Sequence, residues 1–242
     1  MNDFGQASPP AGTFSQVTAG RQHACALRSI RTLVCWGDDS AHQSTLPLRV
    51  DPATTFVSVG AGSWHTCGLK TDGTVVCWGR NGNGQTSPPA DTFTSLSAGG
   101  WHNCGVKTDG TLACWGNNDE GKSTPPAGTF TAASASKFHT CAIRTAGTLA
   151  CWGDNAFGRA TPPAGTFIAV ATGRFHSCAI KTDGTVACWG YNNHGQNKPP
   201  PGTFTAISAG PINTCGVRTN GRVVCWGDNG TGESTPPPGF NQ

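Results

Sequence analysis

The sequence predicts an all-β protein, a β-propeller of six four-stranded antiparallel blades with one hairpin disulfide in each blade. The cysteines fall into six pairs with nine residues between the members of each pair, and every second cysteine opens a Cys-Trp-Gly tripeptide. The pairs recur every 37 residues after a first step of 42 residues, a period typical of propellers and other repeat folds. Short alternating segments, 34 glycines and 17 prolines favour small, radially repeated sheets. A ring with seven positions and a β-solenoid are the alternatives.

We expect a single domain over residues 1–242, because a chain of this length buries roughly 70 to 75% of its unfolded-state surface. The six repeats are predicted to span residues 14–55, 56–92, 93–129, 130–166, 167–203 and 204–239. Residues 4–13 resemble the end of a further repeat and form an orphan blade-end segment. We expect residues 4–10 to add an outer strand to the last hairpin or to a neighbouring molecule.

Each repeat is interpreted as four strands. The first strand starts at a phenylalanine, and the second repeat then shows strand two at residues 65–70, a turn at residues 71–73 and strand three at residues 74–78. A three-residue loop with glycine in third place suits a type I turn followed by a left-handed residue. The proline-containing segment that follows is expected to be an outer edge strand, because proline cannot donate to a central ladder.

This turn fixes the register of the hairpin. It predicts that Lys70 faces Thr74, Leu69 faces Val75 and Cys67 faces Cys77. Opposed residues on antiparallel strands bring their β-carbons to roughly 4.5–5.5 Å, close enough for a disulfide. We therefore predict six hairpin disulfides, which pair Cys25 with Cys35, Cys67 with Cys77, Cys104 with Cys114, Cys141 with Cys151, Cys178 with Cys188, and Cys215 with Cys225.

Reduced core thiols and a metal site are the alternatives for the cysteines. A metal would take ligands such as His65, Cys67 and Cys77, but structural zinc needs four ligands and the sixth repeat has Asn213 in place of the histidine. We predict no metal and no cofactor. A disulfide that closes about ten residues contributes roughly 2.5–3 kcal/mol in the chain-entropy model, and disulfides indicate an oxidising compartment.

The repeat resembles the regulator-of-chromosome-condensation family of propellers. Residues 98–102, 108–111 and 115–118 carry this resemblance, with the sequences Ala-Gly-Gly-Trp-His, Thr-Asp-Gly-Thr and Trp-Gly-Asn-Asn. The paired cysteines are similar to those of bacterial secreted members and of the extracellular repeats of plant crinkly-type receptor kinases. The resemblance implies binding through loops and no catalysis, and it does not carry over guanine-nucleotide exchange or chromatin binding.

Composition excludes several classes of function. The formal net charge is +3 with 12% charged residues, and the basic residues do not cluster, so we expect no nucleic acid partner. No apolar run reaches membrane length, and we expect no membrane insertion. No catalytic constellation stands out, so the protein is not expected to be an enzyme. Acids such as Asp72, Asp109 and Asp183 are explained by turn geometry.

Because the predicted disulfides indicate an oxidising compartment, we expect a secreted or cell-surface protein, extracellular or periplasmic. Residues 1–4 do not form a secretory signal, so we expect the signal peptide to be absent from this chain. Five histidines stand at the start of strand two, at positions 23, 65, 102, 139 and 176. We interpret them as structural residues that bond the backbone rather than as a functional ring.

The loops at the two ends of the strands differ in variability. The turns between strands two and three are monotonous, whereas the loops before the histidines and after the Cys-Trp-Gly tripeptides vary. The candidate partner-binding residues on this variable face are Arg21, Gln22, Trp64, Trp101, Lys137, Phe138, Arg174, Phe175, Tyr191 and His194. Tryptophan, tyrosine and arginine supply most hot-spot energy at protein interfaces. The alternative is that these rings only pack between blades.

The resemblance adds a functional expectation for four of these rings. Bacterial β-lactamase-inhibiting propellers of the family grip a protein with aromatics at the places of Trp64, Trp101, Phe138 and Phe175. We expect a non-catalytic binding module with a protein partner. The alternatives are a lectin-like, glycan-binding propeller, in which Trp64 and Trp101 stack on sugar rings, and a structural repeat domain of a larger surface protein.

The disulfide prediction has a direct chemical test. Alkylation of the denatured, unreduced protein, purified from an oxidising compartment, should add no label, because all 12 cysteines are paired. Mass spectrometry measures the label, and prior reduction is the positive control. Twelve alkylated thiols without reduction would contradict the pairing.

Overall fold

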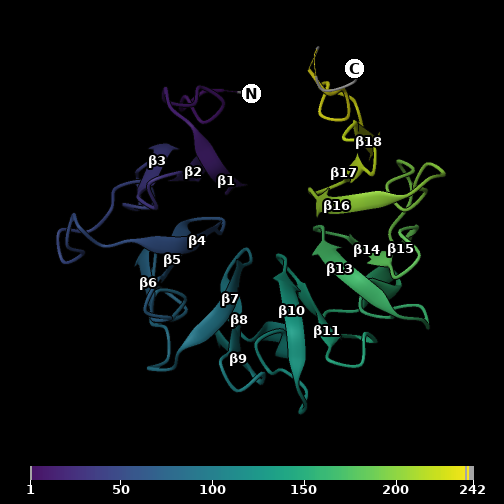
Figure 1. Cartoon of the computed structure of the whole chain (residues 1–242), viewed down its shortest axis with the longest axis horizontal. Coiled ribbons are helices and arrows are strands. Elements are labelled where there is room, and N and C mark those ends of the chain that lie inside the picture. Colours follow the sequence, from purple (N-terminus) through teal and green to yellow (C-terminus); the bar gives the residue numbers. More distant parts are fainter. Residues whose placement is uncertain (1, 238, 240–242) are drawn as a thin grey trace. The chain divides into compact units, whose positions relative to one another are not determined.

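The computed structural model describes residues 2–237 and 239 of the chain. It divides into two compact units, unit 1 at Met1–Asn118 and unit 2 at Asp119–Gln242. Each unit contains three antiparallel sheets that follow one another in chain order (Figure 1), and we call each sheet with its following loop a blade. The sheets of blades 1 to 3 belong to unit 1 and those of blades 4 to 6 to unit 2, while the loop of blade 3 belongs to unit 2 from Asp119 onward.

Every blade has the same three strands. The first strands are β1 (Phe14–Ala19), β4 (Phe56–Ala61), β7 (Phe93–Ala98), β10 (Phe130–Ala135), β13 (Phe167–Thr172) and β16 (Phe204–Ala209). The second strands are β2 (His23–Arg28), β5 (His65–Lys70), β8 (His102–Lys107), β11 (His139–Arg144), β14 (His176–Lys181) and β17 (Asn213–Arg218). The third strands are β3 (Leu33–Gly37), β6 (Val75–Gly79), β9 (Leu112–Gly116), β12 (Leu149–Gly153), β15 (Val186–Gly190) and β18 (Val223–Gly227). Short 3-10 turns η1 (Asp119–Gly121) and η2 (Ala156–Gly158) follow β9 and β12 in sequence.

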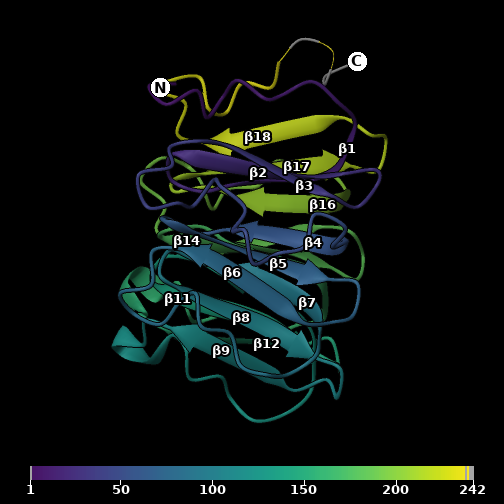
Figure 2. The same ribbon diagram turned by 90° about the vertical axis from the view of Figure 1, so that its left-hand side faces the viewer.

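The prediction of four strands in each blade is wrong, because each sheet has three strands. The segment expected to form the fourth strand satisfies its own backbone groups in a local turn. In blade 2 the Thr86 N–H bonds the Asn81 Oδ1 at 2.8 Å and the Ser87 N–H bonds the Gly84 carbonyl at 3.1 Å. The following prolines have no N–H to offer a ladder. No outer strand therefore forms on β6, and β4, β5 and β6 make the whole sheet (Figure 2).

The hairpin register is confirmed. Cys67 pairs with Cys77 and Leu69 with Val75 across β5 and β6, and Gly73 in the turn has a φ of +84°, the left-handed conformation that glycine adopts readily. Hydrogen-bonded and non-hydrogen-bonded residue pairs alternate along an antiparallel ladder. The two cysteines form a non-hydrogen-bonded pair, the kind in which the Cα atoms come closest. Their Cα atoms lie 4.1 Å apart.

All six predicted disulfides are present in the structure, and no cysteine is free. The disulfides belong to the hydrophobic core, which lies between consecutive blades. In unit 1, Cys67 and Cys77 pack with Phe93 and Trp115 of the next blade. In unit 2, Cys178 packs with Phe204 and with a tryptophan of β18 in the same way. The disulfides of blades 1, 2, 4 and 5 therefore close a hairpin and also fill the space between two sheets.

A buried hydrogen-bond relay joins consecutive blades. The His23 Nε2 lies 2.9 Å from the Thr66 Oγ1 of blade 2, and that hydroxyl donates to the Gln43 carbonyl at 2.8 Å. In the next pair of blades, the His65 Nε2 lies 2.8 Å from the Asn103 Oδ1, while the Asn103 Nδ2 donates to a carbonyl. In unit 2, His139 meets Ser177 and His176 meets Thr214. The histidines are structural, as expected, but their Nε2 atoms bind side chains of the next blade and not the backbone.

The relay determines the tautomer of these histidines. The Thr66 hydroxyl donates to a carbonyl, which only accepts, so its lone pair accepts from the His23 Nε2–H. The Nδ1 atoms of His23, His65 and His176 are buried and have no hydrogen-bond partner in the described part of the chain. A proton on Nδ1 would be buried without an acceptor. Burial accordingly lowers the pKa of His23, His65 and His176 to about 4 and that of His139 to about 3.

The orphan blade-end segment does not behave as expected. Within residues 4–10 no strand forms, and the Gln6 carbonyl accepts a hydrogen bond of 2.9 Å from the Trp36 indole of the first hairpin. The Trp115 indole in blade 3 makes the equivalent bond to the Gln85 carbonyl. Residues 4–10 therefore take the place that the repeat ends before blades 3 to 6 take against the hairpin 30 residues further along the chain.

The helices of the described residues are too short to cross a bilayer. The arrangement as a single propeller domain over residues 1–242, with six or seven ring positions, stays a prediction.

The buried histidines predict acid sensitivity. Their pKa is depressed in the folded state, so the unfolded chain binds more protons below pH 6.5, and stability falls from about pH 6.5 to about pH 4. At pH 5 the expected loss is about 2 kcal/mol for each histidine. Urea unfolding at pH 7 and pH 5 measures it.

The matched variants are His65→Asn and His42→Asn. His65→Asn copies Asn213 of blade 6 and should reduce the pH-dependent loss, whereas the exposed His42 should leave that loss unchanged. Equal stability of the wild-type protein at the two pH values would contradict the assignment.

Candidate functional site

Two variable loops of each blade lie side by side. The N–H after the Cys-Trp-Gly tripeptide bonds the carbonyl of the residue before the histidine, as from Arg80 to Trp64 at 2.8 Å and from Tyr191 to Phe175 at 3.0 Å. Glycine is required in the tripeptide, because Gly79 has a φ of +97° and a Cβ there would lie 2.7 Å from the Trp64 carbonyl oxygen. These paired loops form a surface in each unit, which we call the loop face.

In unit 1 the loop face consists of arginine–tryptophan pairs. The Arg21 guanidinium lies 5.3 Å from the centroid of the Trp64 ring, and the Arg80 guanidinium lies 5.2 Å from that of Trp101. Both arginines are exposed and both indoles are half-buried. Gln22 contributes its carbonyl, which accepts the N–H of Asp38. The structure thus brings these predicted residues together in pairs, with Arg80 as an additional member.

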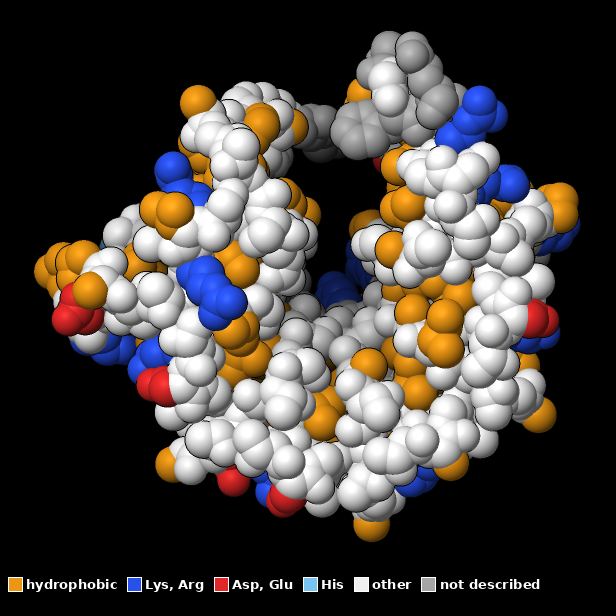
Figure 3. All heavy atoms as spheres, in the orientation of Figure 1, with side chains coloured by type: hydrophobic (Ala, Val, Ile, Leu, Met, Phe, Trp, Pro, Cys, Tyr) orange, Lys and Arg blue, Asp and Glu red, His pale blue; other side chains and the backbone are white. Residues whose placement is uncertain are grey.

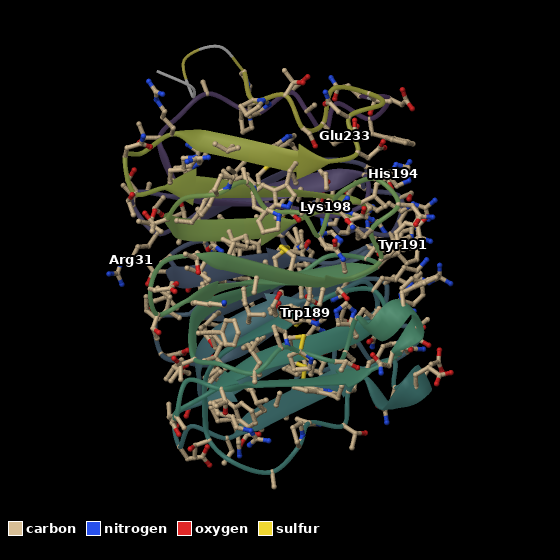
Figure 4. The ribbon with its side chains drawn as sticks, turned by 90° about the vertical axis from the view of Figure 1, so that its right-hand side faces the viewer. Arg31, Trp189, Tyr191, His194, Lys198 and Glu233 are labelled. Atoms are coloured by element: carbon tan, nitrogen blue, oxygen red, sulfur yellow. A yellow bond between two sulfur atoms is a disulfide. The ribbon has the colours of Figure 1, made fainter. Side chains whose placement is uncertain are left out.

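In unit 2 the loop face carries a continuous row of aromatic rings. Phe138 stacks on Phe175 with 5.8 Å between centroids, and Phe175 lies 6.0 Å from Tyr191. The Tyr191 ring meets Phe157 edge-on at 5.0 Å and His194 at 6.3 Å. Figure 4 shows Tyr191 and His194 together beyond Trp189, at the end of β15. We call Phe138, Phe175, Tyr191 and Phe157 the ring row.

Cations cover the ring row. The Arg174 guanidinium lies 4.8 Å from the centroid of Phe175, and the Lys137 ammonium lies 5.1 Å from that of Phe138. The Nδ1 of His194 lies 3.2 Å from the Asp228 Oδ1. The sequence prediction named Arg174, Lys137 and His194, and the structure places them on the same face as the rings that it named.

The sequence prediction missed Arg159, which is buried under the ring row. Its guanidinium lies 4.9 Å from the centroid of Phe138, bonds the Arg174 carbonyl at 3.3 Å and pairs with the Asp154 Oδ2 at 2.6 Å. Burial opposes ionisation of Asp154, but the Arg159 guanidinium and the Ala156 N–H outweigh it and lower the pKa of this carboxyl. Arg159 therefore holds two loops together from below.

Arg159 also explains an unusual turn. In most repeats a glutamine or glutamate at this position accepts the N–H of the residue two before it, as Gln85 does for Asn83 and Gln196 for His194. Arginine cannot accept this bond. Phe157 takes a φ of +63° instead and is 64% exposed. Lys122, in the same position of blade 3, likewise follows a residue with positive φ, Glu120.

The sequence contained a signal for this change. Six repeat ends carry Gln43, Gln85, Lys122, Arg159, Gln196 and Glu233 at equivalent positions. Lysine and arginine are the two members that carry no acceptor. Alignment of the repeat ends by this position would have identified both altered turns and with them Phe157.

The opposite ends of the strands carry the turn aspartates. The Asp72 Oδ1 accepts bonds from the Thr74 N–H and hydroxyl at 2.8 and 2.7 Å. Asp109 and Asp183 make the same contacts with Thr111 and Thr185, and these hydroxyls lower the pKa of each carboxyl. The interpretation of these acids as turn residues is confirmed.

Charged side chains are sparse on the face shown in Figure 3, where Lys and Arg form separate spots among uncharged atoms. In the part of the chain that the structure describes, no three His, Cys, Asp or Glu residues gather as metal ligands.

The comparison with protein families gives six matches. The family model described as "Regulator of chromosome condensation (RCC1) repeat" matches residues 14–43, 56–85, 93–122, 130–159, 167–196 and 204–233. Each match starts at the first phenylalanine of a blade and ends at the position of Gln85 or Arg159. The predicted resemblance is therefore confirmed. A search of curated proteins gave no match.

Solved structures with this fold include two plant receptor ectodomains. The ectodomain of the Physcomitrella patens receptor kinase CR4 is 26% identical, with a TM-score of 0.78, 90% of this chain covered and 63% of that chain. The ectodomain of the Arabidopsis thaliana receptor kinase ACR4 is 29% identical, with a TM-score of 0.76 and coverage of 91% and 83%. Yeast RCC1 (Prp20), solved with Kap60, is 16% identical with a TM-score of 0.80 and coverage of 94% and 72%, and it supports the propeller fold alone. This chain thus spans less than two thirds of the Physcomitrella ectodomain.

The buried Arg159 generates a stability prediction. Arg159→Ala removes the guanidinium that bonds Asp154 and the Arg174 carbonyl and that lies under Phe138, so we expect a loss of about 2 kcal/mol in the free energy of unfolding. Urea denaturation at pH 7 measures it, with the exposed Arg80→Ala as the control. The double variant Arg159→Met/Asp154→Asn should recover part of the loss, and full stability of Arg159→Ala would contradict the role of the pair.

Proposed function

Because this chain belongs to the regulator of chromosome condensation (RCC1) repeat family, we propose that it is a non-catalytic binding module that recognises a protein partner through its loop face. The observation that carries the proposal is the concentration of rings and cations on this face in both units. Aromatic and arginine side chains are the residues that dominate protein interfaces. At the other strand ends, Arg144 and Arg218 also lie over phenylalanines, but those rings, Phe130 and Phe204, are buried and offer no surface to a partner.

An extracellular or periplasmic location forms part of the proposal. Six disulfides, one in every blade, are rare in reducing compartments and common in secreted proteins and surface receptors. The two plant neighbours are receptor ectodomains. We propose a secreted protein or the outer part of a surface protein.

The contacts of the tryptophans favour a protein partner over a glycan. Stacking on a sugar requires an accessible indole face, but Arg21 and Arg80 lie over Trp64 and Trp101. An arginine fixed on an indole keeps its N–H edge for hydrogen bonds to carboxylates or carbonyls. The lectin-like function is therefore the second outcome that the experiment must distinguish.

Affinity capture from the extracellular fraction of the source, beside a glycan array, tests the proposal. Trp64→Ala and Trp101→Ala should each weaken binding of the captured protein by about 2 kcal/mol, the hot-spot range, as measured by calorimetry. Asp72→Ala and Asp109→Ala, at the other ends of the strands, are the matched controls and should bind normally.

Thermal unfolding of each variant separates binding from packing. If the indoles were mainly packing residues, their loss would lower stability by about 3–5 kcal/mol. Normal affinity in the Trp64→Ala/Trp101→Ala double variant would contradict the role of the unit 1 loop face, and a hit confined to the glycan array would favour the lectin-like function.

A further inference from the structure

Phe157 is an exposed aromatic residue held in a backbone conformation that does not suit it. Its φ of +63° lies in the left-handed region, where bulky side chains are rare. The ring is 64% exposed and contacts Tyr191 by its edge. Neither burial nor backbone preference explains a phenylalanine at this position, and residues kept in strained conformations cluster at functional sites.

The neighbouring Arg159 produces this exposure. It removes the acceptor that tethers the same turn in blades 2 and 5, and its guanidinium is used under Phe138 and against Asp154. Arg159, at a position where most repeats have glutamine or glutamate, therefore has two effects. It allows the turn to project Phe157 outward, and its guanidinium supports the ring row from beneath.

The exposed charge over the ring row is positive. Arg174 is exposed, lies over Phe138 and Phe175 at 5.7 and 4.8 Å, and forms no ion pair with a carboxylate of the described residues. The acids nearest the ring row are engaged, since Asp154 pairs with Arg159 and Asp228 lies against His194. At the blade 4 end of the row, Lys122 lies close to Asp119.

We propose that the ring row of unit 2, with Arg174, binds an acidic segment of the protein partner. A carboxylate of the partner pairs with the outward edge of the Arg174 guanidinium, and an adjacent apolar side chain packs on Phe157. Guanidinium groups bind carboxylates with two parallel hydrogen bonds, and stacking on Phe175 holds this arginine in place. The inference rests on the proposed function and names the chemistry of its partner.

Selection from a display library of short random peptides, on the folded disulfide-bonded protein, tests the inference without a known partner. Selected peptides should contain Asp or Glu next to a large apolar residue. A synthetic peptide of this consensus should bind at least about tenfold more tightly than its Asn/Gln counterpart, and its affinity should fall as salt is raised. Fluorescence anisotropy of the labelled peptides measures both effects.

Two variants and one matched control locate the site. Arg174→Ala should weaken binding of the acidic peptide by about tenfold and remove its preference over the Asn/Gln peptide. Arg218→Ala removes an arginine that also stacks on a phenylalanine, Phe204, at 5.4 Å. Because Arg218 ends β17 at its hairpin turn, this control should bind normally.

Phe157→Gly separates a binding role from a structural one. Glycine accepts the left-handed backbone conformation, so the variant should keep a Tm equal to or above that of the wild type while it loses binding by about tenfold. A lower Tm with normal binding would overturn the role of Phe157.

The possible outcomes distinguish the inference from the proposed function. Peptides that need Phe157 but contain no acids would refute the acidic partner and leave protein binding by the loop face intact. Binders that are insensitive to every loop-face variant would refute both. Competition by inorganic phosphate, with no preference for carboxylate peptides, would also overturn the inference, because it indicates a different anion.

Discussion

Within each unit, consecutive blades depend on one buried hydrogen bond, from a histidine Nε2 of one blade to a hydroxyl or amide oxygen of the next. The same hydroxyl or amide, in Thr66 or Asn103, donates to the carbonyl of a repeat end. Three segments are thereby connected through one side chain: a second strand, the second strand of the next blade and the loop between them. Polar groups in such a network have no water to replace a lost partner, so the spacing of neighbouring sheets is tightly specified.

The network also explains the composition of the surrounding residues. Gly62 precedes His65 by three residues, and a Cβ there would lie on the imidazole ring. In blade 4 the same position is Ser136, whose hydroxyl lies 3.0 Å from the His139 Nδ1. The first and the last blade each lack one group of this hydrogen-bond relay. Blade 1 has Ala24 in place of the hydroxyl or amide residue, and blade 6 has Asn213 in place of the histidine. Terminal repeats of stacked arrays are commonly atypical in this way.

A framework fixed in this manner leaves the loop face free to vary. The disulfide closes each hairpin below the loops, and the backbone bond from the residue after Cys-Trp-Gly aligns the two loops. Side chains at these positions can change without loss of the sheet, which is the usual division between a rigid scaffold and its binding loops. Blade 4 shows how far such a change extends, since Arg159 alters the backbone of its own turn and the packing of two aromatic rings.

The sequence by itself determined the hairpins, their register, the six disulfides and the family of the fold, because these follow from local spacing: nine residues between cysteines and a glycine in the third turn position. It also identified Trp64, Trp101, Phe138 and Phe175 as loop residues, since strand parity places both variable loops at the same end of a blade. The tertiary structure alone decided that the segments before the prolines form turns and not a fourth strand, because the carbonyl of Gln85 and its equivalents accepts hydrogen bonds from side chains of the next hairpin. It also decided the partners of the histidines. Those outcomes depend on hydrogen bonds between segments 18 to 43 residues apart, which local patterns do not encode.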